Sequence, residues 1–225
     1  MTSSASDAPD AGFRFRRWAE MLVLYLGLPL AMAAVVHRGH VPLLLALMPV
    51  LGLMVVLMVA DRSFSMRAAL NRGFSLRELG LILAMFAVLG GGLAYWVYAV
   101  EPASFLSFVR ARPKVWLFVM LAYPIMSVVT QEIIYRVFYF HRYRTLFAGN
   151  PALGIVVNSV LFSFGHILFW NWPSIVLTFF GSLIFAWRYY RTQSFWAVAI
   201  EHTLYGNLVF TIGLGGYFFT GVSNL

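Results

Sequence analysis

The chain has 225 residues, of which 61% are hydrophobic and 11% charged, and a formal net charge of +8. With a mean hydropathy of +0.82, it carries more apolar surface than a water-soluble domain of this length can bury, which predicts an integral membrane protein. The absence of cysteine excludes disulfides, thiolate catalysis and cysteine-ligated zinc. In a membrane protein a basic excess is typical of cytoplasmic loops, so we expect no nucleic-acid partner.

The N-terminal stretch MTSSASDAPDAG is polar and rich in small residues. The first apolar run follows this stretch without an A-x-A cleavage pattern, so we expect that run to be retained as a membrane span. The sequence shows no internal repeat and no long linker. We therefore expect a polar tail over residues 1–17 and one transmembrane helical domain over residues 18–225.

Apolar runs follow one another through the rest of the chain. At roughly 20 apolar residues per crossing, they predict an all-α, polytopic membrane bundle of about eight transmembrane helices. The expected spans are 18–36, 41–60, 79–100, 115–139, 151–170, 173–190, 195–207 and 208–219.

Basic residues predict the orientation of the bundle. Most of them fall beside alternate ends of the expected spans, at Arg14, Arg16, Arg17, Arg62, Arg67, Arg72, Arg77, Arg142, Arg144, Arg188 and Arg191. This distribution favours a cytoplasmic N-terminus. Arg110, Arg112 and Lys114 would then lie outside, and the stretch ASFLSFVRARPK around them has the pattern of an interfacial amphipathic segment.

The fourth expected span contains polar residues that are costly at membrane depth unless they are paired or face water. These are Gln131, Glu132 and Arg136 in the stretch TQEIIYR. Glu132 and Arg136 are four residues apart, so they share one helix face and can form an ion pair. Such a pair is compatible with a purely structural role.

Other expected spans carry further titratable groups. FSFGH places His166 in the fifth span, and WAVAIEHTLYGN places Glu201, His202 and Asn207 in the seventh. A lone histidine in a membrane helix is commonly an interhelical hydrogen-bonding group. Two histidines with two carboxylates can do more, because a carboxylate beside one imidazole can activate water while the second imidazole stabilises an oxyanion.

Three motifs resemble one protein family. QEIIYR, FSFGH and RTQSFWAVAIEHTLYGN are similar, in order and spacing, to the signature regions of the CAAX prenyl protease and bacteriocin-processing family, also called the Abi family. The resemblance covers residues 123–207 and places a protease-like core at about 115–220. It implies a glutamic-type intramembrane endopeptidase without a cofactor, acting on a membrane-embedded or lipid-modified peptide. In eukaryotic members that substrate is a prenylated protein C-terminus. The branch of the family that the chain resembles implies a bacterial source, and so a location in the bacterial plasma membrane.

The chain departs from the family pattern at two positions. Gln131 stands where the family has its first glutamate, and an amide cannot take a proton from water. Gly206 stands where the family has an asparagine, and Asn207 follows one residue later. One residue turns a helical side chain by about 100°, so Asn207 would need a locally widened helix to face His202.

Three explanations of Gln131 are open: an inactivating substitution, a naturally inactive branch, or replacement by another carboxylate. We favour the third, with Glu132 or Glu201 as the base, since burial near a second carboxylate raises the pKa of one of them. Arg136 cannot act as a base, so we expect it to orient Glu132.

Two other functions compete with proteolysis. Gln131 is compatible with a non-catalytic member that binds or chaperones a membrane partner. The buried carboxylates and histidines are also compatible with a small proton-coupled transporter, although the chain lacks the repeat that many transporters show. We assign no metal ligand, because the zinc motif H-E-x-x-H is absent. The oligomeric state is not predicted.

Overall fold

A computed structural model describes residues 10–39 and 43–218, and these residues form helices and short turns without any strand. The all-α prediction is confirmed. The helices are α1 (Ala11–Leu22), α2 (Leu28–Gly39), α3 (Leu43–Ala60), α4 (Met66–Leu70), α5 (Leu76–Met85), α6 (Gly91–Val100), α7 (Ser107–Ala111), α8 (Pro113–Tyr123), α9 (Val129–Glu132), α10 (Tyr139–Arg142), α11 (Pro151–Gly165), α12 (Trp172–Thr192) and α13 (Phe195–Thr211).

Several neighbouring helices join through wider, π-type turns into long continuous rods. Such turns connect α1 to α2, α5 to α6, and α8 through α9 to α10. Four helical stretches of the described chain are long and apolar enough to cross a membrane, namely Ala11–Arg38, Leu76–Val100, Pro113–Arg142 and Pro151–Phe169. The chain is therefore an integral membrane protein, as its composition predicts.

The expected count of about eight spans is not confirmed. α13 continues as one helix from Phe195 through Leu208 to Thr211, so the expected break between residues 207 and 208 is wrong. After Thr211 the chain turns, and the last of the described residues form the short 3₁₀ segment Gly215–Phe218. The apolar run is continuous here and Asn207 is tolerated in the helix, which is why composition alone misplaced the boundary.

Two further boundaries differ from expectation or cannot be compared. α1 begins at Ala11, inside the expected polar tail, because the Asp10 side chain accepts a hydrogen bond from the backbone N–H of Gly12 and caps the helix. The expected starting residue of the second span, Val41, lies outside the described residues, as does the expected last residue of the eighth span, Phe219.

Helix starts in the second half of the chain carry clear sequence signals. Asn150, Asn171 and Ser194 each accept a hydrogen bond from a backbone N–H in the first turn of α11, α12 and α13, respectively. Pro151 and Pro173 follow two of these caps, where a missing N–H costs nothing. These caps fix where the three helices that surround the central rod begin.

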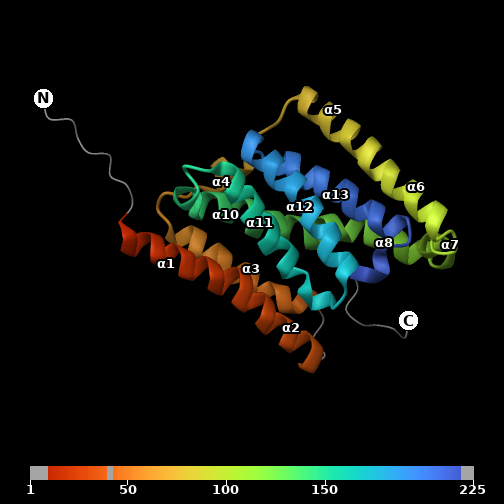
Figure 1. The fold of residues 1–225 in the computed structure, drawn as a ribbon, viewed down its shortest axis with the longest axis horizontal. Helices are drawn as coiled ribbons and strands as arrows, with labels where there is room; N and C mark the ends of the chain where they lie inside the picture. Colours follow the sequence, from red (N-terminus) through yellow and green to blue (C-terminus); the bar gives the residue numbers. More distant parts are fainter. Residues whose placement is uncertain (1–9, 40–42, 219–225) are drawn as a thin grey trace, which may run out of the picture.

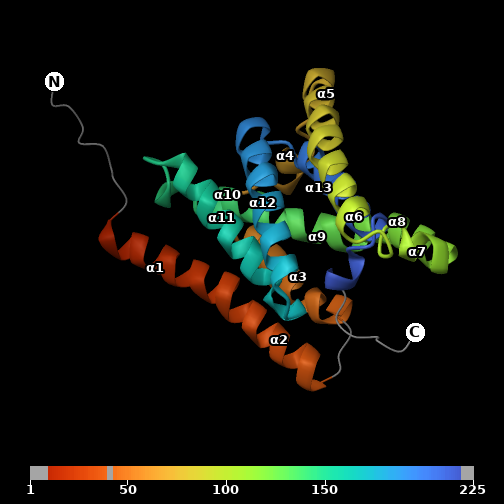
Figure 2. The ribbon, with the colours of Figure 1, turned by 45° about the vertical axis from the view of Figure 1, so that its right-hand side comes forward.

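The central rod α8–α10 lies between two outer rods (Figure 1). The α1–α2 rod runs along one edge of the molecule and the α5–α6 rod along the opposite edge, and a view turned by 45° shows the same arrangement (Figure 2). α11, α12 and α13 pack around the central rod. The buried core between them contains Tyr25, Phe138, Phe162 and Phe185.

Basic loops gather at one end of this bundle. Arg142, at the end of α10, binds Glu20 of α1 and Asp61 after α3 with nitrogen–oxygen distances of 2.9 and 3.2 Å. At the same end, the Ser194 hydroxyl donates to the backbone carbonyl of Arg72 at 2.8 Å. The loops after the second and fourth expected spans therefore share one end. Their position on the cytoplasmic side stays a prediction.

Candidate functional site

The site is built on a distorted stretch of the central rod. π-type turns at Pro124–Val128 and Ile133–Phe138 flank the single α-helical turn of α9, which ends at Glu132. Proline has no N–H to donate, so Pro124 cannot continue the regular hydrogen-bond ladder. Wide turns inside helices occur frequently at functional sites, because they change the direction in which side chains point.

Glu132 connects two helices through its two carboxylate oxygens. Oε1 lies 2.7 Å from Nδ1 of His202 on α13, and Oε2 lies 3.3 Å from Nε of Arg136 one turn along the central rod. The carboxylate and the guanidinium are fully buried, and the His202 side chain is 7% exposed. The ion pair predicted from the four-residue spacing is therefore present, and it reaches a histidine on another helix.

Aromatic rings surround this chain of charges. The Arg136 guanidinium lies over the Phe162 ring of α11, 4.7 Å from its centroid, and 5.8 Å from that of Phe185 on α12. The Phe185 ring also stacks on the His202 imidazole at 4.7 Å. Arg136 Nη2 donates to the Ser182 hydroxyl at 3.2 Å. The rings supply cation–π attraction, which partly offsets the cost of burying the charges.

His166 follows directly after α11, and its ring lies 4.7 Å from the Phe162 ring. Its Nδ1 lies 2.8 Å from the backbone carbonyl of Phe162. A carbonyl oxygen only accepts hydrogen bonds, so Nδ1 must carry the proton and Nε2 of the neutral ring keeps its lone pair. Phe162 also lies 5.8 Å from the His202 ring. One phenyl ring therefore contacts both histidines that the sequence indicates.

Gln131 lies directly before Glu132 and is half-buried. Its Nε2 donates to the Ser127 hydroxyl at 2.7 Å. Its Oε1 is buried without a hydrogen-bond partner among the described residues. The amide therefore keeps a free acceptor, which can receive a hydrogen bond from water although it cannot take the proton.

Glu201 belongs to a different cluster. Its carboxylate receives two hydrogen bonds of 2.9 Å from Nε and Nη2 of Arg188 on α12, and Arg188 Nη1 also binds Glu78 of α5. Adjacent residues of a helix point about 100° apart, so Glu201 and His202 face different neighbours. The assignment of Arg188 to a basic loop is wrong, because its side chain is fully buried inside the bundle.

Asn207 does not face His202. α13 is a regular α-helix through Gly206 and Asn207, so the widened turn that this contact would require is absent from the described helix. The Asn207 amide nitrogen donates instead to the backbone carbonyl of Met120 at 3.3 Å. The space beside Gly206 is taken by Tyr123 of α8, whose hydroxyl lies 3.1 Å from Nε2 of His202.

Sequence reasoning missed Tyr123 and Arg188. Tyr123 stands eight residues before Gln131 without any motif around it, and only the structure shows its contact with His202. Arg188 could have been found, because a glutamate in an apolar helix such as Glu201 requires a buried partner, and Arg188 lies on the preceding helix.

Unpaired polar atoms concentrate around these residues. Buried atoms without a hydrogen-bond partner within the described chain include Gln131 Oε1, Arg136 Nη1 and Asn207 Oδ1, while Glu132 Oε2 and Arg136 Nε have only each other, as an ion pair at 3.3 Å. Buried polar groups are paired in the great majority of cases, so each exception calls for a functional or solvent-based explanation. The concentration is typical of a site that water or a ligand completes.

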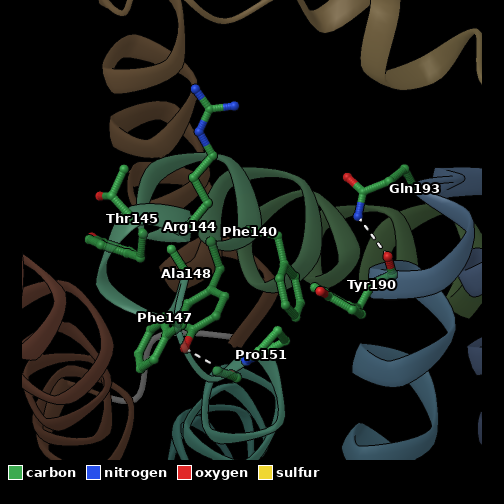
Figure 3. A pocket seen from close by; sticks show the side chains of 11 residues that line it. Phe140, Arg144, Thr145, Phe147, Ala148, Pro151, Tyr190 and Gln193 are labelled. Atoms are coloured by element: carbon green, nitrogen blue, oxygen red, sulfur yellow. Dashed lines mark hydrogen bonds between the residues drawn. The ribbon is translucent and has the colours of Figure 1, made fainter. Parts of the chain in front are cut away.

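A separate cavity of about 430 Å³ lies at the basic end of the bundle. Phe140 and Pro151 face Tyr190 and Gln193 of the α12 end across it (Figure 3). None of the site residues discussed above lines this cavity. Within residues 10–39 and 43–218, no group of three or more histidine, aspartate or glutamate side chains could hold a metal ion.

Comparison with known proteins bears on the central rod and the helices after it. Residues 113–208 match the family model described as Type II CAAX prenyl endopeptidase Rce1-like. This match confirms the resemblance carried by the three motifs. It extends from the start of α8 into α13 and includes Glu132, Arg136, His166 and His202. Comparisons with curated proteins and with solved structures gave no match.

Proposed function

We propose that this chain is an intramembrane endopeptidase that cleaves a prenylated or otherwise lipid-modified peptide, because residues 113–208 match the family model of the type II CAAX prenyl endopeptidases. The observation that carries the proposal is the contact between Glu132 and His202. A carboxylate and an imidazole on two helices lie 2.7 Å apart in a buried site within the matched segment.

His166 is the group that we propose as the base. The Phe162 carbonyl holds the proton on Nδ1, so Nε2 is the nitrogen that can accept one. A water O–H bond breaks, its proton moves to Nε2, and the hydroxide oxygen bonds to the scissile carbonyl carbon. His166 then returns the proton to the leaving amine nitrogen, so that the peptide bond is hydrolysed without any net change in the enzyme.

The carboxylates have supporting roles in this proposal. Both oxygens of Glu132 already face Arg136 and His202, and both oxygens of Glu201 face Arg188. Glu132 holds the orientation of His202 by accepting a hydrogen bond from its Nδ1, and the His202 ring lines the site between Glu132 and Tyr123. Gln131 Oε1, which has no partner among the described residues, can orient the attacking water. The expectation that Glu132 or Glu201 acts as the base is therefore less well supported than His166.

The experiment is cleavage of farnesylated peptides by the full chain in liposomes, followed by mass spectrometry, with the same peptides unprenylated for comparison. We expect cleavage of the prenylated peptides and a loss of about 100-fold or more for His166→Ala. His141→Ala is the matched control, because His141 lies outside the site and contacts Asp61. Equal cleavage by the two variants would contradict the assignment of His166.

A second function, binding a lipid-modified partner without cleaving it, is favoured by one observation. Gln131 places an amide bonded to Ser127 beside Glu132, and an amide cannot take a proton from water. If no peptide is cleaved but prenylated peptides bind more tightly than unprenylated ones, the chain is a binding protein built on a protease fold. The same liposomes, with fluorescent peptides, measure this affinity.

A further inference from the structure

Tyr123 contacts the site histidine from the side opposite Glu132. Its hydroxyl lies 3.1 Å from Nε2 of His202, while Nδ1 lies 2.7 Å from the Glu132 carboxylate. A carboxylate only accepts hydrogen bonds, so Nδ1 carries the proton and Nε2 of the neutral ring accepts the Tyr123 O–H. Both nitrogens of His202 therefore have a partner, and each partner comes from the central rod.

Gly206 is the residue that makes room for this contact. It stands one helical turn after His202, so the two positions share one face of α13. A Cβ atom at position 206 would lie 2.5 Å from the Tyr123 hydroxyl oxygen and 2.6 Å from Cζ. Both distances are shorter than van der Waals contact, so any other residue would displace the phenol.

Packing holds the Tyr123 ring in this place. Its centroid lies 5.3 Å from that of Phe210, one turn beyond Gly206, in an edge-to-face arrangement. It also lies 6.2 Å from the His202 ring. Edge-to-face pairs at such distances are favourable. The contact with His202 is thus supported by α13 over three successive turns.

We propose that Tyr123 is a positioning residue for His202. Gly206 permits this role because it has no side chain in the space that the Tyr123 phenol occupies. The phenol fixes the tautomer and the ring orientation from the Nε2 side, as Glu132 does from the Nδ1 side. The effect of Tyr123 on turnover rests on the proposed function. Its effect on the chemical accessibility of His202 does not, so the positioning role and the proposed function can be refuted independently.

The first experiment measures the accessibility of Nε2 without any substrate. Diethyl pyrocarbonate acylates unprotonated imidazole nitrogens, and peptide mass spectrometry gives the rate at His202 in the full chain. Tyr123→Phe keeps the ring and removes the hydroxyl. Loss of one hydrogen bond should raise the rate by about 3- to 10-fold, with the rate at His141 as the internal reference. An unchanged rate at His202, including no labelling in either protein, overturns the proposal.

Tyr205→Phe is the matched control for the loss of a hydroxyl. Tyr205 lies on α13 close to His202, and its buried hydroxyl has no hydrogen-bond partner among the described residues. We expect its removal to leave the labelling of His202 unchanged. If Tyr205→Phe raises the rate as much as Tyr123→Phe does, the effect comes from loosened packing and the positioning role is wrong.

A second pair of variants tests Gly206. Gly206→Ala should displace the phenol and raise the labelling of His202 to the level of Tyr123→Phe. Gly91→Ala is its control, because a Cβ at position 91 of α6 meets nothing within 4 Å. Thermal unfolding shows whether each variant is folded. A folded Gly206→Ala protein with normal labelling overturns the role of Gly206.

A rescue experiment separates hydrogen bonding from packing. Tyr123→Ala should expose His202, and adding Gly206→Asn places an amide donor one turn from His202 in the space that the phenol leaves. We expect the double variant to be labelled more slowly than Tyr123→Ala alone. No recovery would contradict the claim that a donor to Nε2 is what matters.

The kinetic measurement links the positioning role to cleavage. With a prenylated peptide, Tyr123→Phe should lower kcat by about 3- to 10-fold and leave KM unchanged, because Tyr123 acts through His202. If the unmodified chain does not cleave but labelling of His202 rises in Tyr123→Phe, the proposed function fails and the positioning role stands. If cleavage and labelling are both unaffected, the positioning role fails and the proposed function stands.

Discussion

Arg136 Nε lies 3.3 Å from Glu132 Oε2, and neither side chain is exposed. This pair lies within Pro113–Arg142, a segment long and apolar enough to cross a membrane. A buried charge that loses its partner has no water to replace it. The pair therefore supports His202, and the loss of either member would leave an unpaired charge buried in the central rod.

Replacing Arg136 by glutamine should destabilise the folded chain strongly. Glu132 would keep its contact with His202 but lose the cation beside Oε2, and breaking a buried pair costs about 3–5 kcal/mol. Thermal unfolding in detergent measures the change. Arg144→Gln is the control, because Arg144 is exposed and a surface change should stay within about 0.5 kcal/mol. Equal unfolding temperatures for the two variants would contradict this reading.

Glu201→Gln should affect stability more than chemistry. Arg188 holds the Glu201 carboxylate through two hydrogen bonds, so we expect a lower unfolding temperature with nearly normal cleavage per folded molecule. Glu101→Gln, at an exposed carboxylate, is the control for the loss of a negative charge. If Glu201→Gln instead abolishes cleavage at an unchanged unfolding temperature, Glu201 is the base and His166 is not.

The sequence was informative where a local rule applied. The four-residue spacing of Glu132 and Arg136 predicted their pairing, since helix geometry alone places i and i+4 on one face. The apolar runs predicted helices, and their starts agree with Asn and Ser caps. The same helix geometry applied to Asn207. Asn207 stands one residue beyond the family position, which indicated that it would not face His202 without a widened turn.

Contacts between distant segments could not be predicted in this way. Tyr123 and Gly206 are 83 positions apart on two helices that pack together. Neither a tyrosine nor a glycine at these positions predicts the contact. Arg188 was misplaced because an arginine near the end of an apolar run is typical of a loop. Only tertiary packing shows that it neutralises Glu201. The expected break after Asn207 was wrong because a single polar amide interrupts the apolar run without ending the helix. Hydropathy alone therefore does not give the end of α13.

Gln131→Glu should raise cleavage. The new carboxylate would keep the contact with Ser127, whose hydroxyl can donate to it, and would add a proton acceptor beside Glu132. General base catalysis contributes about 100- to 10,000-fold, so we expect an increase in kcat of at least about 10-fold. The measurement is the initial rate on a prenylated peptide.

The control for this change is Gln193→Glu, which adds the same charge after α12, far from Glu132 along the chain and outside the site. An increase in both variants would mean that net charge, not the position of the carboxylate, affects the rate. No cleavage by either protein, together with tight binding of prenylated peptides, would favour the non-catalytic function.

Acid should weaken the basic end of the bundle through Asp61. Hydrogen bonds from the Ser63 hydroxyl and backbone N–H, and from Arg142, hold the pKa of Asp61 well below its ordinary value. A carboxyl with a lower pKa in the folded chain than in the unfolded chain stabilises the fold above its unfolded pKa of about 3.9. This stabilisation is lost as the pH falls below that value.

At neutral pH, Asp61→Asn should therefore unfold at a lower temperature than the unmodified chain, and the two unfolding temperatures should converge as the pH falls below about 4. Glu101→Gln provides the comparison for a carboxylate outside this cluster, and a constant difference between Asp61→Asn and the unmodified chain at every pH would contradict the linkage.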